Sequence, residues 1–131
     1  DVNPANNVSK ENSKKLLLGI MSNKVNSLNG IDTATVDINY ANEEGITPLI
    51  AAINNKNVEL VKTIILNGAN VNKNDAYKTS PLMYATYKGN LEIIEILLKN
   101  GAKKMSKDEF GENAYDRAYG NKKVLELLNR Y

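Results

Sequence analysis

The sequence repeats itself at a step of 33 residues. Residues 47–52, Thr-Pro-Leu-Ile-Ala-Ala, return as residues 80–85, Ser-Pro-Leu-Met-Tyr-Ala. The Asn-Gly-Ala motif of residues 67–69 returns at residues 100–102 with the same step. A fixed step of this length is typical of proteins built from stacked supersecondary units, each of which buries its apolar face only against its neighbours. The repeat therefore predicts a stack of similar units.

Each copy of the repeat predicts two short helices. Thr47 and Ser80 are good N-cap residues, and the proline that follows each of them is tolerated at the first helical position. Asn57 and Asn90 are placed to cap a second helix, with apolar residues at helical spacing and a glutamate in the first turn. The glycine of each Asn-Gly-Ala motif is suited to end that helix. The unit is therefore a helix, a turn and a second helix, followed by a polar stretch that leads to the next cap.

These motifs together resemble the ankyrin repeat, including the Val71-Asn72 tail that follows the second helix. In that family each repeat has two antiparallel helices and a hairpin-like finger, and the repeats stack into a curved solenoid. The resemblance covers roughly residues 13–131 and implies an all-α fold of about four stacked repeats with terminal caps. One departure stands out, because Ile50 and Met83 occupy the position where the family usually has histidine. We expect apolar packing there in place of the hydrogen bond that the family makes to a neighbouring finger.

The chain divides into a short arm and one domain. Residues 1–8 are polar and contain Pro4 and three asparagines, which predicts a flexible arm, with an arm docked on the domain as the alternative. A helix should begin near Ser9 or Ser13, and a single repeat domain should occupy residues 9–131. The approximate repeats are residues 13–39, 40–72, 73–105 and 106–131.

The two terminal units depart from the pattern and should act as caps with one polar face. In the first unit an Asn-Gly pair at residues 29–30 interrupts the second helix, so we expect a short helix over residues 23–28 and an irregular loop to Val36. In the last unit Asn113 replaces the usual cap residue, and the first helix should be shorter than in the other units. The last helix should end near Tyr131 with a charged and polar outer side.

Three polar stretches between the helices correspond to the fingers of the family: residues 40–46, 73–79 and 103–111. Gly45 and Gly111 are the expected turn residues of the first and third fingers, two steps apart. Lys78 stands at that position in the second finger, which predicts either a different turn or the strain of a positive φ angle.

One position is small in every unit: Gly19, Ala52, Ala85 and Ala118. Close approach of helices from adjacent repeats explains this, since a larger side chain would push the stack apart. Tyr84 and Tyr119 should pack between helices.

The residue types present exclude several kinds of chemistry. The chain has no histidine and no cysteine, so Ser-His and Cys-His nucleophile pairs, His/Cys zinc sites and disulfides are all absent. Asn72, Asn74 and Asp75 alternate like part of a calcium loop, but the glycine and closing glutamate of that motif are missing, which favours a structural turn. Adjacent carboxylates occur at two places: Glu43 with Glu44, and Asp108 with Glu109 and Glu112. Both groups fall on exposed finger loops, so we expect solvated charges, no catalytic residue, no cofactor and no metal.

Charge and hydropathy argue against nucleic-acid and membrane partners. The chain has 17 basic and 15 acidic residues and a net charge of +2, which is too balanced to favour nucleic acid or an anionic membrane. The longest apolar run, residues 16–21, is far shorter than a membrane span. The chain begins at Asp1 rather than Met, which fits either a trimmed chain or removal of a targeting segment. The compartment is therefore open between the cytoplasm and a periplasmic or secreted location for a soluble protein.

In the ankyrin family, partners usually lie against the concave side, which is built from finger tips and the first helix of each repeat. By position, the resemblance places these residues there: Glu43, Glu44, Ile46, Asn54, Asn55, Ala76, Tyr77, Thr79, Tyr87, Lys88, Glu109, Phe110 and Glu112. Tyr77, Tyr87 and Phe110 are the candidate anchors, because aromatic side chains contribute much of the binding energy at protein interfaces. Packing of Tyr77 or Phe110 on a neighbouring finger is the alternative.

These observations favour a non-enzymatic module that binds another protein through this concave face and is monomeric by itself. The alternative is a structural or accessory subunit of a larger assembly. A third class, an enzyme that uses carboxylates alone, has little support in the sequence.

Overall fold

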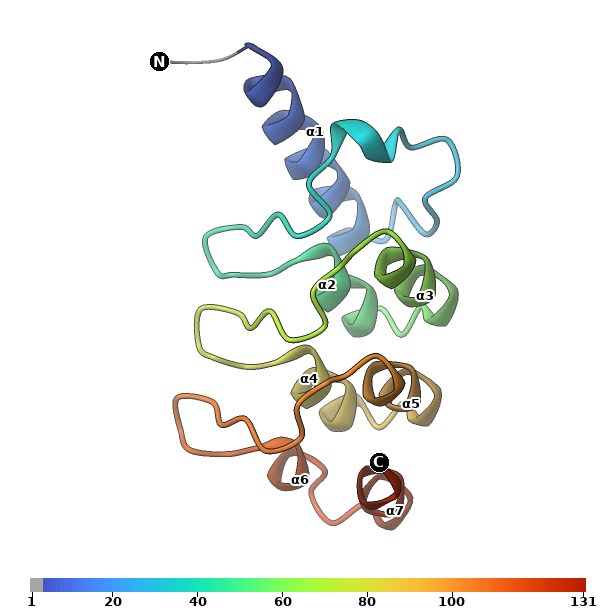
Figure 1. Ribbon diagram of the computed structural model, residues 1–131, viewed down its shortest axis with the longest axis vertical. Coiled ribbons are helices and arrows are strands. Elements are labelled where there is room, and N and C mark those ends of the chain that lie inside the picture. Colours follow the sequence, from blue (N-terminus) through green and yellow to red (C-terminus); the bar gives the residue numbers. More distant parts are fainter. Residues whose placement is uncertain (1–3) are drawn as a thin grey trace.

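The structure of the protein, a computed structural model, describes residues 4–131, with side chains from residue 9 onward. Within this range every regular element is a helix, as the repeat predicted, and no strand is present. The elements are α1 (Pro4–Met21), η1 (Thr33–Thr35), α2 (Pro48–Asn54), α3 (Val58–Leu66), α4 (Pro81–Lys88), α5 (Leu91–Lys99), α6 (Ala114–Arg117) and α7 (Lys122–Arg130). They form an all-α stack of paired helices (Figure 1).

The stack has two layers of helices and a row of finger loops. Helices α1, α2, α4 and α6 pack in order to form the inner layer, and α3, α5 and α7 pack in order to form the outer layer. The three fingers project from the inner layer, on the side away from the outer helices (Figure 1). The inner helices and the fingers therefore share one side of the molecule.

The predicted caps begin the paired helices. The hydroxyl groups of Thr47 and Ser80 accept hydrogen bonds from the backbone N–H three residues ahead, at 3.2 and 3.1 Å, where α2 and α4 begin. Asn57 and Asn90 do the same for α3 and α5, both at 3.1 Å. Each cap pairs one of the N–H groups that a helix start leaves without a partner inside the helix.

Two asparagines tie each repeat to the next. The side chain of Asn39 donates to the carbonyl of Gly68 at 3.2 Å and accepts from the backbone N–H of Asn70 at 2.7 Å. Asn72 makes the equivalent pair of bonds one step later, at 3.0 and 2.9 Å. Met105 stands at the next equivalent position, where the stack ends, and is 65% exposed.

The core runs through all the units. Ala52, Ala85 and Ala118 are buried, so the recurring small position lies within the stack as expected. Gly19 differs, because a Cβ atom there would lie 2.5 Å from a methyl carbon of Val25 in its own unit. The glycine is needed for the close approach of the loop after α1 rather than for a neighbouring repeat.

At the position where the family usually has histidine, the side chains of Ile50 and Met83 are buried. Their side chains are 0% and 1% exposed, so this position contributes to the apolar packing of the inner layer. Burying such side chains contributes on the order of 1.5–3 kcal/mol each.

The N-terminal helix is longer than the sequence predicted. It begins at Pro4 rather than near Ser9 or Ser13, so the arm expected over residues 1–8 is helical from Pro4 onward. Residues 1–3 of that arm lie outside the described residues. Proline is compatible with a helix start because its missing N–H is one of the groups that would have no partner inside the helix.

The short helix expected over residues 23–28 was a wrong prediction. Asn23 has a φ angle of 59°, which reverses the chain directly after α1. The backbone N–H groups of Lys24 and Val25 both donate to the carbonyl of Gly19 at 2.9 Å, which closes a turn instead of starting a helix. The loop then leads to η1, and together with α1 it lines an open cavity of about 350 Å³. The first unit therefore contributes one helix to the inner layer, and on the outer side a loop takes the place of the second helix, joined to the start of α3 by a hydrogen bond from Asn57 to the carbonyl of Asn26 at 3.0 Å (Figure 1).

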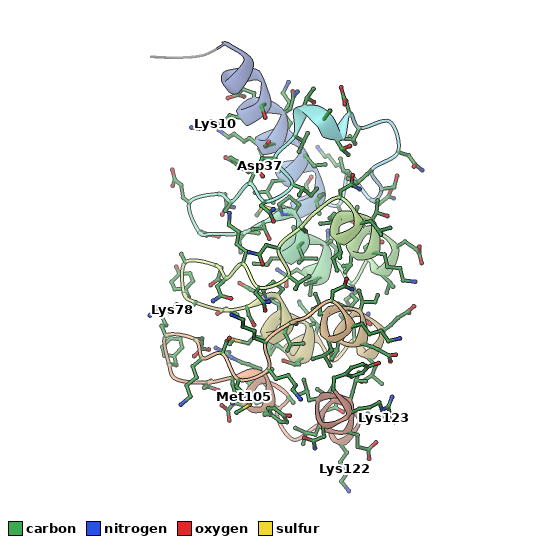
Figure 2. The ribbon with its side chains drawn as sticks, in the orientation of Figure 1. Lys10, Asp37, Lys78, Met105, Lys122 and Lys123 are labelled. Atoms are coloured by element: carbon green, nitrogen blue, oxygen red, sulfur yellow. The ribbon has the colours of Figure 1, made fainter. Side chains whose placement is uncertain are left out.

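The C-terminal unit has the predicted form. Its first helix, α6, has only four residues, and Asn113 caps it with a capping box. The outer side of α7 is exposed, and Lys122 points away from the stack (Figure 2). Tyr119 departs from the prediction, because it is 66% exposed and does not pack between helices.

In the described part of the chain, no helix combines the length and apolar character needed to cross a membrane.

Candidate functional site

The three fingers are built on the same turn, and one side chain holds each of them. Asn42, Asp75 and Asp108 are spaced by the repeat step and begin the three turns. One side-chain oxygen of each accepts hydrogen bonds from the backbone N–H groups two and four residues ahead, at distances of 2.8–3.0 Å. This arrangement pairs N–H groups that an exposed loop would otherwise leave to water.

The fourth residue of each turn has a positive φ angle. The angle is 79° at Gly45, 63° at Lys78 and 78° at Gly111. Lys78 therefore adopts the glycine conformation within the same turn, at the tip of the second finger (Figure 2). Of the two possibilities left open by the sequence, the structure shows the strained backbone.

Neighbouring fingers are hydrogen-bonded to each other. The backbone N–H of Ala76 donates to the carbonyl of Glu44 at 2.9 Å, and the N–H of Glu109 donates to the carbonyl of Tyr77 at 3.2 Å. A Cβ atom at Gly45 would lie 2.4 Å from the backbone nitrogen of Ala76, so only glycine allows the first two fingers to approach this closely. The row of fingers is therefore a connected surface rather than a set of free loops.

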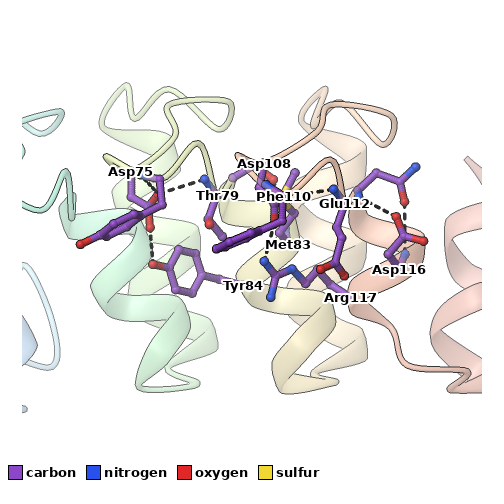
Figure 3. A network of polar contacts seen from close by, with 12 residues as sticks. Asp75, Thr79, Met83, Tyr84, Asp108, Phe110, Glu112, Asp116 and Arg117 are labelled. Carbon is purple, nitrogen blue, oxygen red and sulfur yellow. Dashed lines mark hydrogen bonds and ion pairs between the residues drawn. The ribbon is translucent and has the colours of Figure 1, made fainter.

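The second oxygen of each carboxylate has a different partner in the second and third fingers (Figure 3). The phenol of Tyr84 donates to Asp75 at 2.5 Å. Arg117 forms an ion pair with Asp108. Tyr84 and Arg117 lie on α4 and α6, each nine residues after the carboxylate, so these contacts fasten the fingers to the inner helices.

These contacts shift pKa values in directions that follow from the geometry. Burial and the hydrogen bond to Asp75 raise the pKa of the Tyr84 phenol, because both disfavour its ionised form. Burial raises the pKa of Asp108, but the hydrogen bonds from Arg117 and from the backbone N–H groups of Glu112 and Phe110 outweigh it. The net effect is a lowered pKa for Asp108.

A cavity of about 300 Å³ lies where the second and third fingers meet α4 and α6. The residues that line it are Asp75, Tyr77, Thr79, Met83, Tyr84, Tyr87, Phe110 and Arg117. The three aromatic residues singled out by the sequence are among them, and Tyr77, Tyr87 and Phe110 are 54%, 60% and 73% exposed. The ring of Tyr119 meets that of Tyr87 edge-on, with centroids 5.9 Å apart, and extends the aromatic surface. We call this cavity and its lining residues the aromatic cleft.

A smaller cavity of about 230 Å³ lies at the equivalent place near the N-terminal end. It is lined by Met21, Glu44, Ile46, Ala51, Asn54 and Asn55. The side-chain amide of Asn55 donates to the carbonyl of Ile20 at 2.6 Å, so this residue joins α2 to α1. The remaining predicted residues lie outside both cavities: Glu43, Ala76, Lys88, Glu109 and Glu112.

The sequence did not single out Asp75, Met83, Tyr84 and Arg117 as members of the site. The signal that could have found the carboxylates is the repeat step itself, which relates Asp75 to Asn42 and Asp108. The residue nine positions after each turn residue is alanine, tyrosine and arginine in the three units, so the repeat does not identify Tyr84 and Arg117 as partners of the carboxylates. Among the described residues, no group of three or more carboxylates is placed to hold a metal ion.

Comparison with known proteins agrees with this architecture. A search of curated proteins found no match to the chain. The family model described as ankyrin repeats, in three copies, matches residues 8–108, which is most of the chain. The paired helices, their caps and the connected fingers fit that match, and we conclude that the protein belongs to the ankyrin-repeat family.

Proposed function

We propose that this chain is a protein-binding module that uses its finger side, and within it the aromatic cleft, as the contact surface. Ankyrin-repeat domains are generally protein-binding modules and are typically not catalytic. The proposal adds the location of the site and the residues that form it.

The observation that carries the proposal is the exposure of three aromatic rings around one cavity. Tyr77, Tyr87 and Phe110 come from two fingers and one inner helix, and each is more than half exposed. Clustered aromatic residues at a concave surface are typical of the residues that contribute most binding energy at an interface. Their exposure favours this proposal over the alternative in which Tyr77 or Phe110 packs on a neighbouring finger.

The surroundings of the cleft support recognition without a large ordering cost. The turns that carry Tyr77 and Phe110 are held by Asp75 and Asp108, and neighbouring fingers are hydrogen-bonded. Side chains on a surface that is already ordered lose less conformational entropy when a partner binds. A rigid cleft favours a specific partner over a range of loosely bound ones.

The experiment is affinity capture from the native source with matched variants, read by quantitative mass spectrometry. Tyr77→Ala combined with Tyr87→Ala removes two rings of the cleft. Leu66→Ala combined with Tyr131→Ala is the control, because both residues are exposed apolar residues outside the cleft and the finger turns. We expect the cleft variant to capture at least about 90% less of a partner, which corresponds to a loss of about 1.4 kcal/mol or more in binding free energy. The control variant should capture as much of that partner as the wild-type protein does.

Equal capture by the wild-type protein and the cleft variant would contradict the proposed site. A partner that both variants retain and that high salt does not release would favour the structural or accessory role instead.

A further inference from the structure

The aromatic cleft contains one carboxylate that has no cationic partner. Asp75 lines the cleft and is 8% exposed. It accepts two backbone N–H bonds at 2.8 and 2.9 Å and the phenol of Tyr84 at 2.5 Å. Among residues 4–131, no lysine or arginine lies within ion-pair distance of it. A carboxylate has about four acceptor positions, so one of them is left over.

The third finger shows what a cation does at the equivalent carboxylate. Asp108 accepts the same two backbone hydrogen bonds within its turn, and its other carboxylate oxygen forms an ion pair with Arg117 of α6. Tyr84 stands at the position of Arg117 one step earlier, and its phenol is neutral. The second finger therefore has the negative charge of the third finger without its built-in positive partner.

The charge of the turns and of the inner helices that follow them points in the same direction. The three segments that run from each turn residue through the inner helix after it, residues 42–54, 75–88 and 108–117, carry seven carboxylates and three cations, a net charge of −4. The complete chain has a net charge of +2, so the remaining residues, which include the lysines at the start of the second and third fingers, carry a net charge of +6. Of the three cations, Arg117 is neutralised by Asp108, and only Lys78 and Lys88 oppose a positive ligand.

From these observations we propose that the aromatic cleft receives a lysine or arginine side chain of a basic, extended segment of the partner protein. The methylene groups of that side chain pack on Tyr77, Tyr87 and Phe110, and its charged group reaches Asp75. Aromatic faces attract a cation, and the attraction grows when water is displaced from the site. This inference rests on the proposed protein-binding function and adds the chemistry of the partner.

The test uses short capped peptides that alternate glycine with lysine, compared with peptides that carry norleucine or glutamate in place of lysine. Each peptide is titrated into the isotope-labelled protein, and amide chemical shifts are followed by NMR. We expect the lysine peptide to shift signals around Tyr77, Tyr84 and Phe110, with a Kd about tenfold or more below that of the norleucine peptide. Raising the salt concentration should weaken this binding.

Two variants separate the local charge from the general charge of the protein. Asp75→Asn should keep the turn, because Asn42 already holds the first finger through the same two bonds. Asp37→Asn is the matched control, since Asp37 and its equivalent Asn70 both accept a backbone N–H bond at 2.9 Å. Both changes remove one negative charge, but we expect only Asp75→Asn to raise the Kd of the lysine peptide, by about fivefold or more.

Three results would overturn the inference: norleucine binding as well as lysine, equal effects of the two variants, or no shift in the cleft with the lysine peptide. None of these results affects the capture experiment, in which the aromatic variant is tested against the native partner. The proposed function can therefore stand while the basic partner segment is rejected.

Discussion

A single side chain at the start of each finger sets the shape of a whole loop. Asparagine performs this role at residue 42 and aspartate at residues 75 and 108, with similar hydrogen-bond distances. The turn therefore needs an acceptor oxygen and not a negative charge. The charge of Asp75 and Asp108 is available for other interactions, which are the phenol of Tyr84 and the ion pair with Arg117.

Gly45 and Gly111 provide a matched pair for measuring close approach. Their φ angles are 79° and 78°, so alanine is strained at both. Only at Gly45 would the new Cβ atom meet backbone atoms, at 2.4–2.8 Å, whereas nothing lies within 4 Å at Gly111. We expect the free energy of unfolding in urea to fall by about 1 kcal/mol for Gly111→Ala and by about 2 kcal/mol or more for Gly45→Ala. Equal losses would show that the first two fingers separate at no cost.

Lys78 is strained at the same turn position, and glycine should relieve it. Its φ angle is 63°, in the region that disfavours residues with a Cβ atom. Glycine also increases the freedom of the unfolded chain, which offsets part of the gain. We expect Lys78→Gly to raise the free energy of unfolding by up to about 1 kcal/mol, measured by urea denaturation. Lys107→Gly, on another exposed stretch without a positive φ angle, is the control and should not stabilise the protein.

At the scale of the elements, polar side chains make two kinds of link, one between neighbouring repeats and one within a repeat. Asn39 and Asn72 each bond to the end of the next outer helix, and Tyr84 and Arg117 each bond an inner helix to its own finger. Helices of seven to nine residues are marginal by themselves. Their stability therefore depends on these links and on the apolar packing between layers.

Asn72 and Met105 occupy equivalent positions, but only Asn72 joins two repeats. Asn72→Ala removes both of its hydrogen bonds, to Gly101 and to the N–H of Lys103. We expect a loss of about 1–2 kcal/mol in the free energy of unfolding, and a change within about 0.5 kcal/mol for the exposed Met105→Ala. Chemical denaturation of the two variants is the measurement. A similar small effect in both would mean that the asparagine bridge is replaced by water.

Asp108 should contribute a measurable part of the acid sensitivity of the protein. Its pKa in the folded state lies below the ordinary value of 3.8, so the unfolded chain binds more protons in this range. Its contribution to stability is complete above that ordinary value and is lost as the pH falls through the lower folded value.

We therefore expect the wild-type protein to lose more stability between about pH 7 and pH 3 than Asp108→Asn does, measured by urea unfolding at both values. The variant should also be less stable at neutral pH, because Arg117 loses the carboxylate with which it is paired. Glu95, whose pKa is also lowered by its contact with Lys99, is present in both proteins and cancels in the comparison. An identical acid loss in both proteins would exclude this role for Asp108.

At the scale of the whole molecule, each repeat is stabilised by the units on either side of it. Helix α4 packs against both α2 and α6, whereas α6 is the last inner helix. In such a stack the stability is approximately a sum of unit terms and nearest-neighbour terms. A change at an internal interface should therefore cost more than the equivalent change at the end.

Ala85 and Ala118 test this expectation at the recurring small position. Ala85 is 0% exposed and lies between neighbours on both sides, while Ala118 is 5% exposed at the end of the inner layer. We expect Ala85→Val to lower the free energy of unfolding by about 1–3 kcal/mol through overpacking, and Ala118→Val to lower it by less than half as much. Thermal and urea unfolding would measure both. A larger loss at Ala118 would contradict nearest-neighbour stabilisation.

The local signals in the sequence were sufficient for the regular part of the fold. The caps at Thr47, Ser80, Asn57 and Asn90 begin four helices, because a cap is satisfied by backbone groups within the next three residues. The helix prediction failed where a turn directly after α1 decided the outcome. The turn at Asn23 and the packing of Val25 on Gly19 removed the helix expected over residues 23–28.

By itself, the sequence determined the repeated helical unit, the caps and the positions of Tyr77, Tyr87 and Phe110 on the fingers and inner helices, because these follow from spacing along the chain. Only the tertiary structure decided that these rings surround one cavity and that Asp75 lies among them without an ion-pair partner. The physical reason is that a hydrogen bond or an ion pair depends on distances of a few ångströms between side chains from different elements. A repeat step places equivalent residues in equivalent positions, but it does not specify which side chain each of them meets.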